Sequence, residues 1–283
     1  MKITFLGTSA AEGYPARWCM CPHCTYARTH GGRNIRANCS AIVDDAVLLD
    51  LNNATMDQMA RFGISPEKVK TALITHPHMD HFLPNALEWR KEVLPADCEG
   101  TRPDGSLVFR PAPPMTMVGN AFTQQALRKF FPDTSRFSID FVCARGGDTL
   151  FLDGYRILCL RANHGAPGFC TNYLLEKDGK RLLYAVDSGG YDEGMMARLR
   201  REKLDMLVME GTGGDRDLGT RHMNTSRNIE ARRALIGAGI IREDTPVVIT
   251  HMSPHWTAPH DEYAPRLEEL GMICAYDGLT LEI

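Results

Sequence analysis

The segment of the sequence richest in chemically active side chains is residues 71–81, which read TALITHPHMDH. It places His76, His78, Asp80 and His81 within six residues. In an extended or tightly turned segment, His76 and His78 point to the same side and can grip one metal ion. Asp80 and His81 then face another side, which suits a second ion. Imidazole and carboxylate groups bind zinc, manganese or iron. A polar loop with incidental histidines is a poor explanation of this density, so the run predicts a metal centre.

Three further side chains of the same chemical types stand just past apolar runs that read as β-strands. They are His164, Asp187 and His251, which follow the runs 158–160, 183–186 and 247–250. Ligands in α/β folds bind outside the carboxyl ends of strands. Taken singly, His164 or His251 is more often an ordinary loop or core histidine. Together with the histidine run, we interpret all three as metal ligands at one edge of a sheet system.

Two more residues are candidates for proton transfer. Glu210 ends the strand-like run Met206–Met209, and His222 lies in the segment GTRHMNTS before a predicted helix. Hydrolysis needs a proton donor for the leaving group. The alternative for His222 is a loop histidine that faces solvent. Asp80 has a possible second role, which is to orient an attacking hydroxide.

A second cluster of metal-binding type is formed by Cys19, Cys21 and Cys24, in a segment 19–24 that we predict to be a loop. Closely spaced thiolates bind Zn²⁺ tetrahedrally, with a fourth ligand from elsewhere. The nine cysteines are odd in number and unevenly spaced, which argues against a disulfide scaffold. The remaining six are expected to be small buried residues: Cys39, Cys98, Cys143, Cys159, Cys170 and Cys274.

Short apolar runs alternate with helical patterns along the chain and predict the elements that position these residues. Strands are predicted at Lys2–Leu6, Ala46–Leu51, Thr71–Thr75, Met115–Val118, Tyr155–Leu160, Asn172–Glu176, Arg181–Val186, Met206–Glu210 and Pro246–Thr250. Helices are predicted at Thr55–Phe62, Ala121–Phe131, Glu193–Lys203, Ser226–Gly237 and Asp261–Leu270. The end of the chain predicts a hairpin of Ile273–Tyr276 and Leu279–Ile283 around an Asp277-Gly278 turn. Residues 90–115 lack periodicity and predict an inserted loop.

Composition narrows the class of protein. The 283 residues are 43% hydrophobic and 24% charged, which is ordinary for a globular protein. The formal net charge of −3 gives no sign of a nucleic-acid partner. No run approaches the ~18 apolar residues of a membrane helix, and the start MKITFLGTSA is too short for a signal peptide. We therefore expect a cytoplasmic protein with no membrane partner.

The ligand pattern resembles the metallo-β-lactamase superfamily from end to end, in the order and spacing of its HxHxDH motif and later single ligands. The resemblance implies a four-layer αββα sandwich built as one domain over 1–283. It also implies that His76, His78 and His164 hold one metal, that Asp80, His81 and His251 hold the other, and that Asp187 bridges them. True β-lactamases usually carry Cys at the position of Asp187, and diiron flavoprotein relatives carry Glu at the position of His78, which argues against both activities.

The cysteine cluster resembles one subfamily more narrowly, the cyclic phosphodiesterase of the carbon–phosphorus lyase (phosphonate degradation) pathway. There, three cysteines and a histidine just after the last catalytic histidine hold a structural Zn²⁺. Here that histidine is His255, with His23 and His260 as competing candidates. Phosphodiesterases of the superfamily also carry a histidine paired with an acid, which implies that His222 donates the proton or binds phosphate and that Glu210 holds its tautomer.

The resemblance implies a binuclear phosphodiesterase that hydrolyses a small cyclic phosphodiester, with phosphoribosyl 1,2-cyclic phosphate as the family-implied substrate, by attack of a metal-bridging hydroxide. It would use two divalent catalytic metals (Mn²⁺ or Zn²⁺) and one structural Zn²⁺.

The alternative enzyme functions are those of a tRNA 3′-processing nuclease and of a thioester or lactone hydrolase. The nuclease needs a basic arm, and Arg102 and Arg110 in the insertion are offset by Asp97, Glu99 and Asp104. A pyrroloquinoline quinone biosynthesis protein shares the CxCxxC loop but lacks the full histidine set. A zinc-stabilised binding protein is the non-enzymatic alternative, and a second copy of the chain, giving a homodimer, is a further candidate partner.

Overall fold

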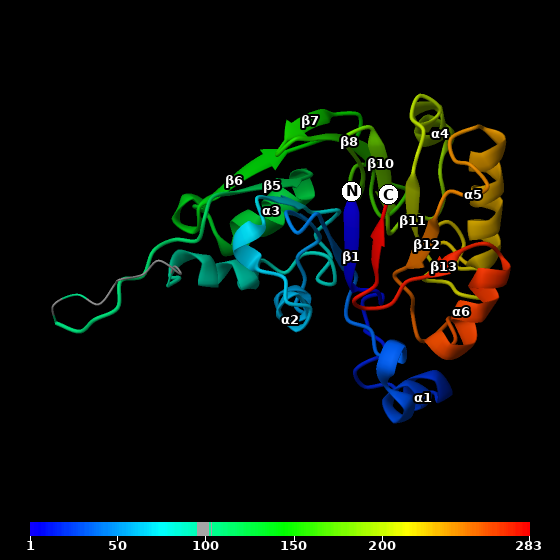
Figure 1. The fold of residues 1–283 in the computed structure, drawn as a ribbon, viewed down its shortest axis with the longest axis horizontal. Helices are drawn as coiled ribbons and strands as arrows, with labels where there is room; N and C mark the ends of the chain where they lie inside the picture. The colour runs from blue at the N-terminus through cyan, green and yellow to red at the C-terminus, as the bar shows by residue number, and fades with distance from the viewer. Residues whose placement is uncertain (95–101, 103) are drawn as a thin grey trace.

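Two mixed seven-stranded β-sheets face each other in the computed structural model, which describes residues 1–94, 102 and 104–283 (Figure 1). The first sheet runs in the order β14 (Thr280–Glu282), β1 (Lys2–Gly7), β2 (Ser40–Val43), β3 (Val47–Leu49), β4 (Thr71–Leu73), β5 (Met115–Gly119) and β6 (Ile139–Cys143). The second runs in the order β13 (Ile273–Cys274), β12 (Val247–Thr250), β11 (Met206–Glu210), β10 (Lys180–Ala185), β9 (Thr171–Lys177), β8 (Tyr155–Arg161) and β7 (Thr149–Leu152).

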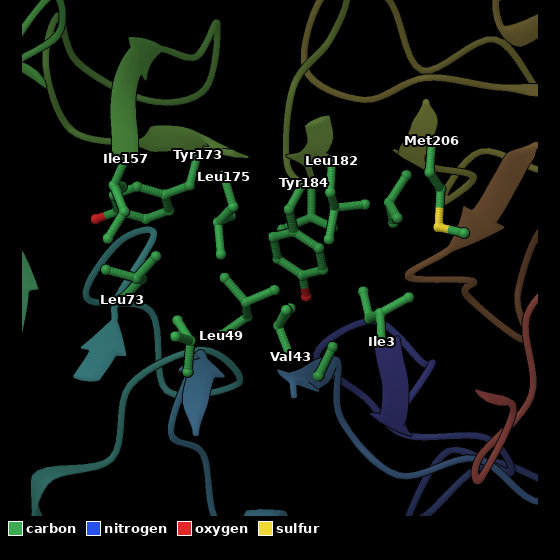
Figure 2. Close-up of a cluster of buried hydrophobic side chains, with 14 of the residues drawn as sticks. Ile3, Val43, Leu49, Leu73, Ile157, Tyr173, Leu175, Leu182, Tyr184 and Met206 are labelled. Atoms are coloured by element: carbon green, nitrogen blue, oxygen red, sulfur yellow. The ribbon is translucent and has the colours of Figure 1, made fainter. Parts of the chain in front are cut away.

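A dry core fills the space between the two sheets. Figure 2 shows side chains of the first sheet, including Ile3 and Leu49, facing Tyr173 and Tyr184 of the second. Successive side chains of a strand point to opposite faces of the sheet. Leu182 and Tyr184 of β10 therefore enter this core, whereas the residues between and after them enter a second core on the outer side. Each sheet is apolar on both faces, so each needs a covering layer.

Helices supply those covering layers. The first sheet packs against α2 (Thr55–Arg61), α3 (Ala121–Phe130) and the 3₁₀ segment η3 (Pro84–Lys91). The second packs against α4 (Glu193–Leu199), α5 (Thr225–Gly237) and α6 (His260–Glu269) (Figure 1). The predicted αββα sandwich is therefore confirmed. Over the described residues, no helix has both the length and the apolar character needed to span a membrane.

The predicted strands and helices are present with small shifts at their ends, and the differences have physical causes. The sequence analysis missed β2, β6 and β7, which are short or lie next to turns. The helix predicted at 193–203 ends at Leu199. The chain turns there because Glu202 pairs with Arg156, at 2.6 Å, and Leu204 enters the outer core. Part of the predicted insertion, including Cys98, lies outside the described residues, and a β-bridge between Val93 and Arg110 joins its two ends.

The predicted C-terminal hairpin is wrong. β13 pairs with β12 in the second sheet, and β14 pairs with β1 in the first, so the segment between them crosses from one sheet to the other. Asp277 does not sit in an exposed turn. Its carboxylate is half-buried and accepts hydrogen bonds from the Ala37 amide at 2.6 Å, the Thr8 hydroxyl at 2.8 Å and the Gln58 amide at 2.8 Å. Tertiary pairing overrides the local Asp-Gly turn signal here.

Two predictions about cysteines also need correction. The segment 19–24 is not wholly a loop, because α1 (Pro22–His30) begins inside it and places Cys24 in its first turn. Pro22 stands at the first helical position, where its fixed φ favours helix initiation. Four scattered cysteines are buried as predicted, but Cys143 is exposed because it ends β6, the edge strand of its sheet.

The half-buried Asp277 should give the stability of the protein a measurable pH dependence. Burial raises its pKa from a usual value of 3.8 to about 6, although the hydrogen bonds from Ala37 and Thr8 oppose the shift. The folded state then holds a proton that the unfolded state has lost, so this contribution is full below about pH 4 and is lost as the pH rises through about 6. Two pKa units correspond to about 3 kcal/mol.

The measurement is the free energy of unfolding in urea from pH 4.5 to 7.5 for the wild type and Asp277→Asn. Asparagine does not ionise, so the variant should lose this part of the slope. The difference between the two profiles should grow by about 2–3 kcal/mol across that range. Parallel profiles would show that Asp277 does not titrate in this window.

Candidate metal centre

Four strands from the two sheets deliver metal-type side chains to one region beyond their carboxyl ends. His76 follows β4, His164 follows β8, Asp187 follows β10 and His251 follows β12. Asp187 and His251 adopt left-handed backbone conformations, with φ of 47° and 56°. Such conformations are uncommon for residues other than glycine and cluster at functional sites. Here they turn the side chains off the strand ends into the site.

The first ligand group consists of His76, His78 and His164, whose ring nitrogens lie within 4.8 Å of one another. His76 Nε2 is 2.8 Å from His78 Nδ1, and His164 Nε2 is 3.4 Å from the same atom. Burial holds the pKa of His76 well below its usual value and lowers that of His78. Both rings are therefore neutral at pH 7, which is the form that binds a metal ion.

The second ligand group consists of Asp80, His81, Asp187 and His251. His81 Nε2 lies 2.7 Å from Asp187 Oδ2 and 3.1 Å from His251 Nε2. Asp187 Oδ2 is also 3.4 Å from His76 Nε2 of the first group, so this oxygen lies between the two groups. Asp187 Oδ1 is buried and accepts no well-formed hydrogen bond, although His222 Nδ1 lies within ion-pair distance of it. A buried donor set of nitrogens and carboxylate oxygens with an unsatisfied atom at its centre fits two divalent cations.

Two residues that the sequence analysis missed contact the Nδ1 atoms of His81 and His251, two of the candidate ligands. Asp50 accepts from His81 Nδ1 at 2.7 Å and is itself held by the Thr75 amide at 2.8 Å. The Thr212 hydroxyl contacts His251 Nδ1 at 2.8 Å. Such partners fix the tautomer of a metal-binding histidine and raise its basicity. Asp50 follows β3 as the ligands follow their own strands, so the same strand-end signal could have found it.

The structure places Glu210 and His222 together beside the second ligand group. The Glu210 carboxylate is fully buried and accepts from the Ser188 amide at 2.9 Å. His222 Nδ1 lies 3.0 Å from Glu210 Oε2 and 3.3 Å from Asp187 Oδ1. Burial favours the neutral ring, but the contacts with the Asp187 and Glu210 carboxylates outweigh it and raise the pKa of His222 to about 10. The Nε2 edge of the ring is the one left for a substrate.

A glycine allows this close approach. A Cβ at Gly189 would lie 1.7 Å from the carbonyl oxygen of Thr220, which is closer than any real contact. Only a residue without a side chain lets the 220–222 segment pack on the turn that follows Asp187. The His222 ring consequently comes within 5.1 Å of the His164 ring and 6.2 Å of the His251 ring, measured between centroids.

The sulfur atoms of Cys19, Cys21 and Cys24 lie within 4.8 Å of one another at the start of α1, in the dark blue part of Figure 1. The Cys21 amide donates to Cys19 Sγ at 3.4 Å, and this contact lowers the pKa of Cys19 to about 7. Burial raises the pKa of Cys24 to about 12. One cysteine is therefore partly a thiolate at neutral pH, and a bound Zn²⁺ would deprotonate the others.

The three histidines proposed as the fourth ligand are placed differently. His255 lies near enough to Cys19 to help lower the pKa of that thiol, although its ring nitrogens are not within 4.8 Å of all three sulfurs. His23 turns its Nδ1 to the Pro254 carbonyl, at 2.9 Å. His260 is buried with its Nδ1 3.0 Å from the Arg36 guanidinium. His255 is thus the best placed of the three.

Replacing Cys21 by serine should remove one equivalent of zinc and lower thermal stability. Structural zinc contributes directly to folding free energy, and losing even about 3 kcal/mol lowers the Tm of a large domain by about 6 °C or more. Hydrolytic activity should persist in part, because the cluster lies outside the histidine site. Metal analysis and thermal unfolding check this result, with the exposed Cys143→Ser as the matched control. Unchanged zinc content in Cys21→Ser would contradict a zinc site at the cluster.

Comparison with known families agrees with the fold. The family model described as the beta-lactamase superfamily domain matches residues 40–252. The chain belongs to the β-lactamase superfamily, and its His/Asp clusters are able to hold metal ions.

Two curated relatives are ribonucleases Z. The enzyme of Methanothermobacter thermautotrophicus is 30% identical over 169 residues, which cover 58% of this chain and 45% of that protein. The enzyme of Pyrococcus horikoshii is 25% identical over 214 residues, which cover 72% and 58%. The matched region thus spans about half the length of these relatives.

Solved structures share the fold over the whole chain. A diphosphatase of the PhnP family superposes with a TM-score of 0.75 at 21% identity, covering 100% of this chain and 97% of that one. Zn²⁺-bound PqqB from Methylobacterium extorquens gives 0.72 at 20% identity and 100% of both chains. The short form of human tRNase Z gives 0.65 at 16% identity, covering 100% and 99%. The TM-scores establish the common fold. Sequence identities this low do not identify the substrate.

Proposed function

We propose that this protein hydrolyses phosphodiesters. The observation that carries the proposal is the Glu210–His222 pair, set beside the His/Asp clusters with one ring edge of His222 left free. Cleaving a P–O bond to an alkoxide leaving group requires a proton at the departing oxygen. A thioester releases a thiolate, which leaves without a proton, whereas a lactone releases an alkoxide as a phosphodiester does. A histidine anchored by a buried carboxylate therefore favours phosphodiester chemistry over thioester chemistry.

The residues of the site divide the work. His76, His78 and His164 would hold one divalent ion, and Asp80, His81 and His251 the other, with Asp187 between them. Two such ions supply a water of lowered pKa and neutralise charge on a phosphoryl group. Asp80 lies at the second ion position and would orient the attacking oxygen. Asp50 and Thr212 would keep His81 and His251 in the tautomers that bind metal. Glu210 would hold Nδ1 of His222, so that Nε2 can donate a proton.

A small cyclic phosphodiester is the substrate class that we favour, with phosphoribosyl 1,2-cyclic phosphate as the specific candidate. Two features support this choice: the fold shared with a PhnP-family diphosphatase, and the CxCxxC cluster, whose three cysteines could hold a metal ion. A tRNA 3′-processing nuclease is the second candidate, because both curated relatives are ribonucleases Z. The net charge of −3 favours the small substrate, since phosphate backbones bind to basic surfaces.

The function is tested on purified protein by metal analysis joined to an activity screen. The substrates are bis(p-nitrophenyl) phosphate, 2′,3′-cyclic nucleotides, a precursor tRNA, a thioester and a β-lactam, each with Mn²⁺ or Zn²⁺ added. Three metals per chain with turnover of the phosphodiesters alone is the expected result and would lead to the phosphoribosyl substrate. Turnover of precursor tRNA would favour the nuclease instead. Turnover of the thioester alone would overturn the proposal.

A further inference from the structure

Glu12 lies beside the cysteine cluster and contacts none of the residues assigned to catalysis. We propose that Glu12 is a positioning residue for a zinc ion at Cys19, Cys21 and Cys24, because it fixes His255 as the fourth ligand through Nε2. This inference rests on the structural-zinc part of the proposed function and is independent of the substrate.

The geometry around Glu12 forms a small closed network. Glu12 Oε1 lies 3.2 Å from His255 Nδ1. The Ser253 hydroxyl donates to the same carboxylate oxygen, and the His255 backbone amide donates to Ser253 Oγ at 3.3 Å. The carboxylate thus receives one hydrogen bond from Ser253 and lies within ion-pair distance of the His255 ring. It holds both the ring of His255 and the backbone that carries it.

This arrangement decides which nitrogen is available. A histidine that binds zinc through one ring nitrogen almost always donates its other N–H to a carboxylate, a carbonyl or water. Glu12 occupies Nδ1, so the lone pair that remains for a metal is on Nε2. The His255 side chain is 41% exposed and lies near Cys19, so it has room to turn toward the three sulfurs.

The same network ties the cluster to the catalytic ligands. Ser253 stands two residues after His251, and the residue between them donates its amide to the Thr8 carbonyl at 3.0 Å. The Ala10 amide in turn donates to the Met252 carbonyl at 3.1 Å. The segment 8–12 therefore lies alongside the segment 251–255. Glu12, at the end of the first segment, contacts Ser253 and His255 of the second. Zinc at the cysteines would brace the loop that presents His251.

Cobalt titration of the metal-free protein tests the role of Glu12. Thiolate-to-cobalt charge-transfer absorption reports on the cysteine cluster and needs no measurement of activity. Partner residues of metal-binding histidines are typically worth 10- to 100-fold in metal affinity. Glu12→Ala should weaken cobalt binding at the cluster by about that factor, and Glu12→Gln, which keeps an acceptor for Nδ1, should lose less.

Further variants separate the competing outcomes. His255→Ala should weaken binding at least as much as Glu12→Ala and change the visible cobalt spectrum. His23→Ala and the exposed Glu230→Ala on α5 should bind like the wild type. Circular dichroism identifies any variant that fails to fold, and Cys21→Ser supplies the spectrum of a broken cluster. Wild-type affinity in Glu12→Ala, or a loss in His23→Ala without one in His255→Ala, would overturn the proposal. A wild-type protein with no charge-transfer band would overturn it too and would leave the phosphodiesterase proposal standing.

Discussion

Replacing Asp187 by alanine should reduce phosphodiester hydrolysis by about a thousandfold or more and lower the metal content of the protein. Its Oδ2 atom is the one that lies between the two ligand groups, 2.7 Å from His81 Nε2 and 3.4 Å from His76 Nε2. Metal ions supply several kcal/mol of transition-state stabilisation, and each 1.36 kcal/mol is a factor of ten in rate. Without Asp187, seven ligands become six and neither ion is held by a shared carboxylate.

The measurement combines metal analysis with the rate of bis(p-nitrophenyl) phosphate hydrolysis at saturating Mn²⁺ or Zn²⁺. The matched control is Asp215→Ala, because Asp215 is exposed and pairs with Arg266 at 2.6 Å on the surface. This control should keep wild-type activity and metal content. If Asp187→Ala keeps both its metals and its turnover, the assignment of the binuclear site is wrong.

The strand-end residues were predictable because the signal is local and repeated. An apolar run followed by a single His or Asp marks the edge of a sheet, and His76, His164, Asp187 and His251 all follow that rule. The structure brings these four together, while their role as ligands stays a prediction. Asp50 obeys the same rule, but the run Ala46–Leu51 reads as one strand, which hides its end at Leu49.

The contacts that the sequence could not reveal are those between distant segments. Asp277 and Gly278 predict a turn because the Asp-Gly pair is a strong local signal. Nothing local shows that β13 and β14 pair with different sheets, or that Thr8, Ala37 and Gln58 gather around the carboxylate. The pairing of Glu12 with His255 is of the same kind, because 243 positions separate the two residues.

Replacing His222 by alanine should slow hydrolysis in a way that depends on the leaving group. General acid catalysis contributes about 10²- to 10⁴-fold, but only where the departing oxygen needs a proton. A 2′,3′-cyclic nucleotide releases a ribose alkoxide and should lose about a hundredfold or more in kcat. Bis(p-nitrophenyl) phosphate releases a stable phenolate and should lose far less. Metal content should be unchanged, because His222 is not one of the seven proposed metal ligands.

The comparison needs a second histidine that has no part in the site. His30 at the end of α1 is exposed and stacks on Tyr26, with ring centroids 3.7 Å apart. His30→Ala should match the wild type on both substrates. Glu210→Gln should show the same leaving-group pattern as His222→Ala, since it removes the charge that anchors His222 Nδ1 and keeps the size of the side chain.

The ratio of the two kcat losses separates proton donation from other roles of His222. If His222 serves as a metal ligand, as its place near His164 and Asp187 allows, its removal should release metal and slow both substrates alike. If it binds the phosphoryl group without donating a proton, both substrates should again slow equally, with metal retained and KM raised. Only a donor gives a large loss on the ribose leaving group and a small one on p-nitrophenolate. Equal losses on the two substrates would therefore remove His222 from the proton-transfer step and leave the Glu210–His222 pair without the role proposed for it.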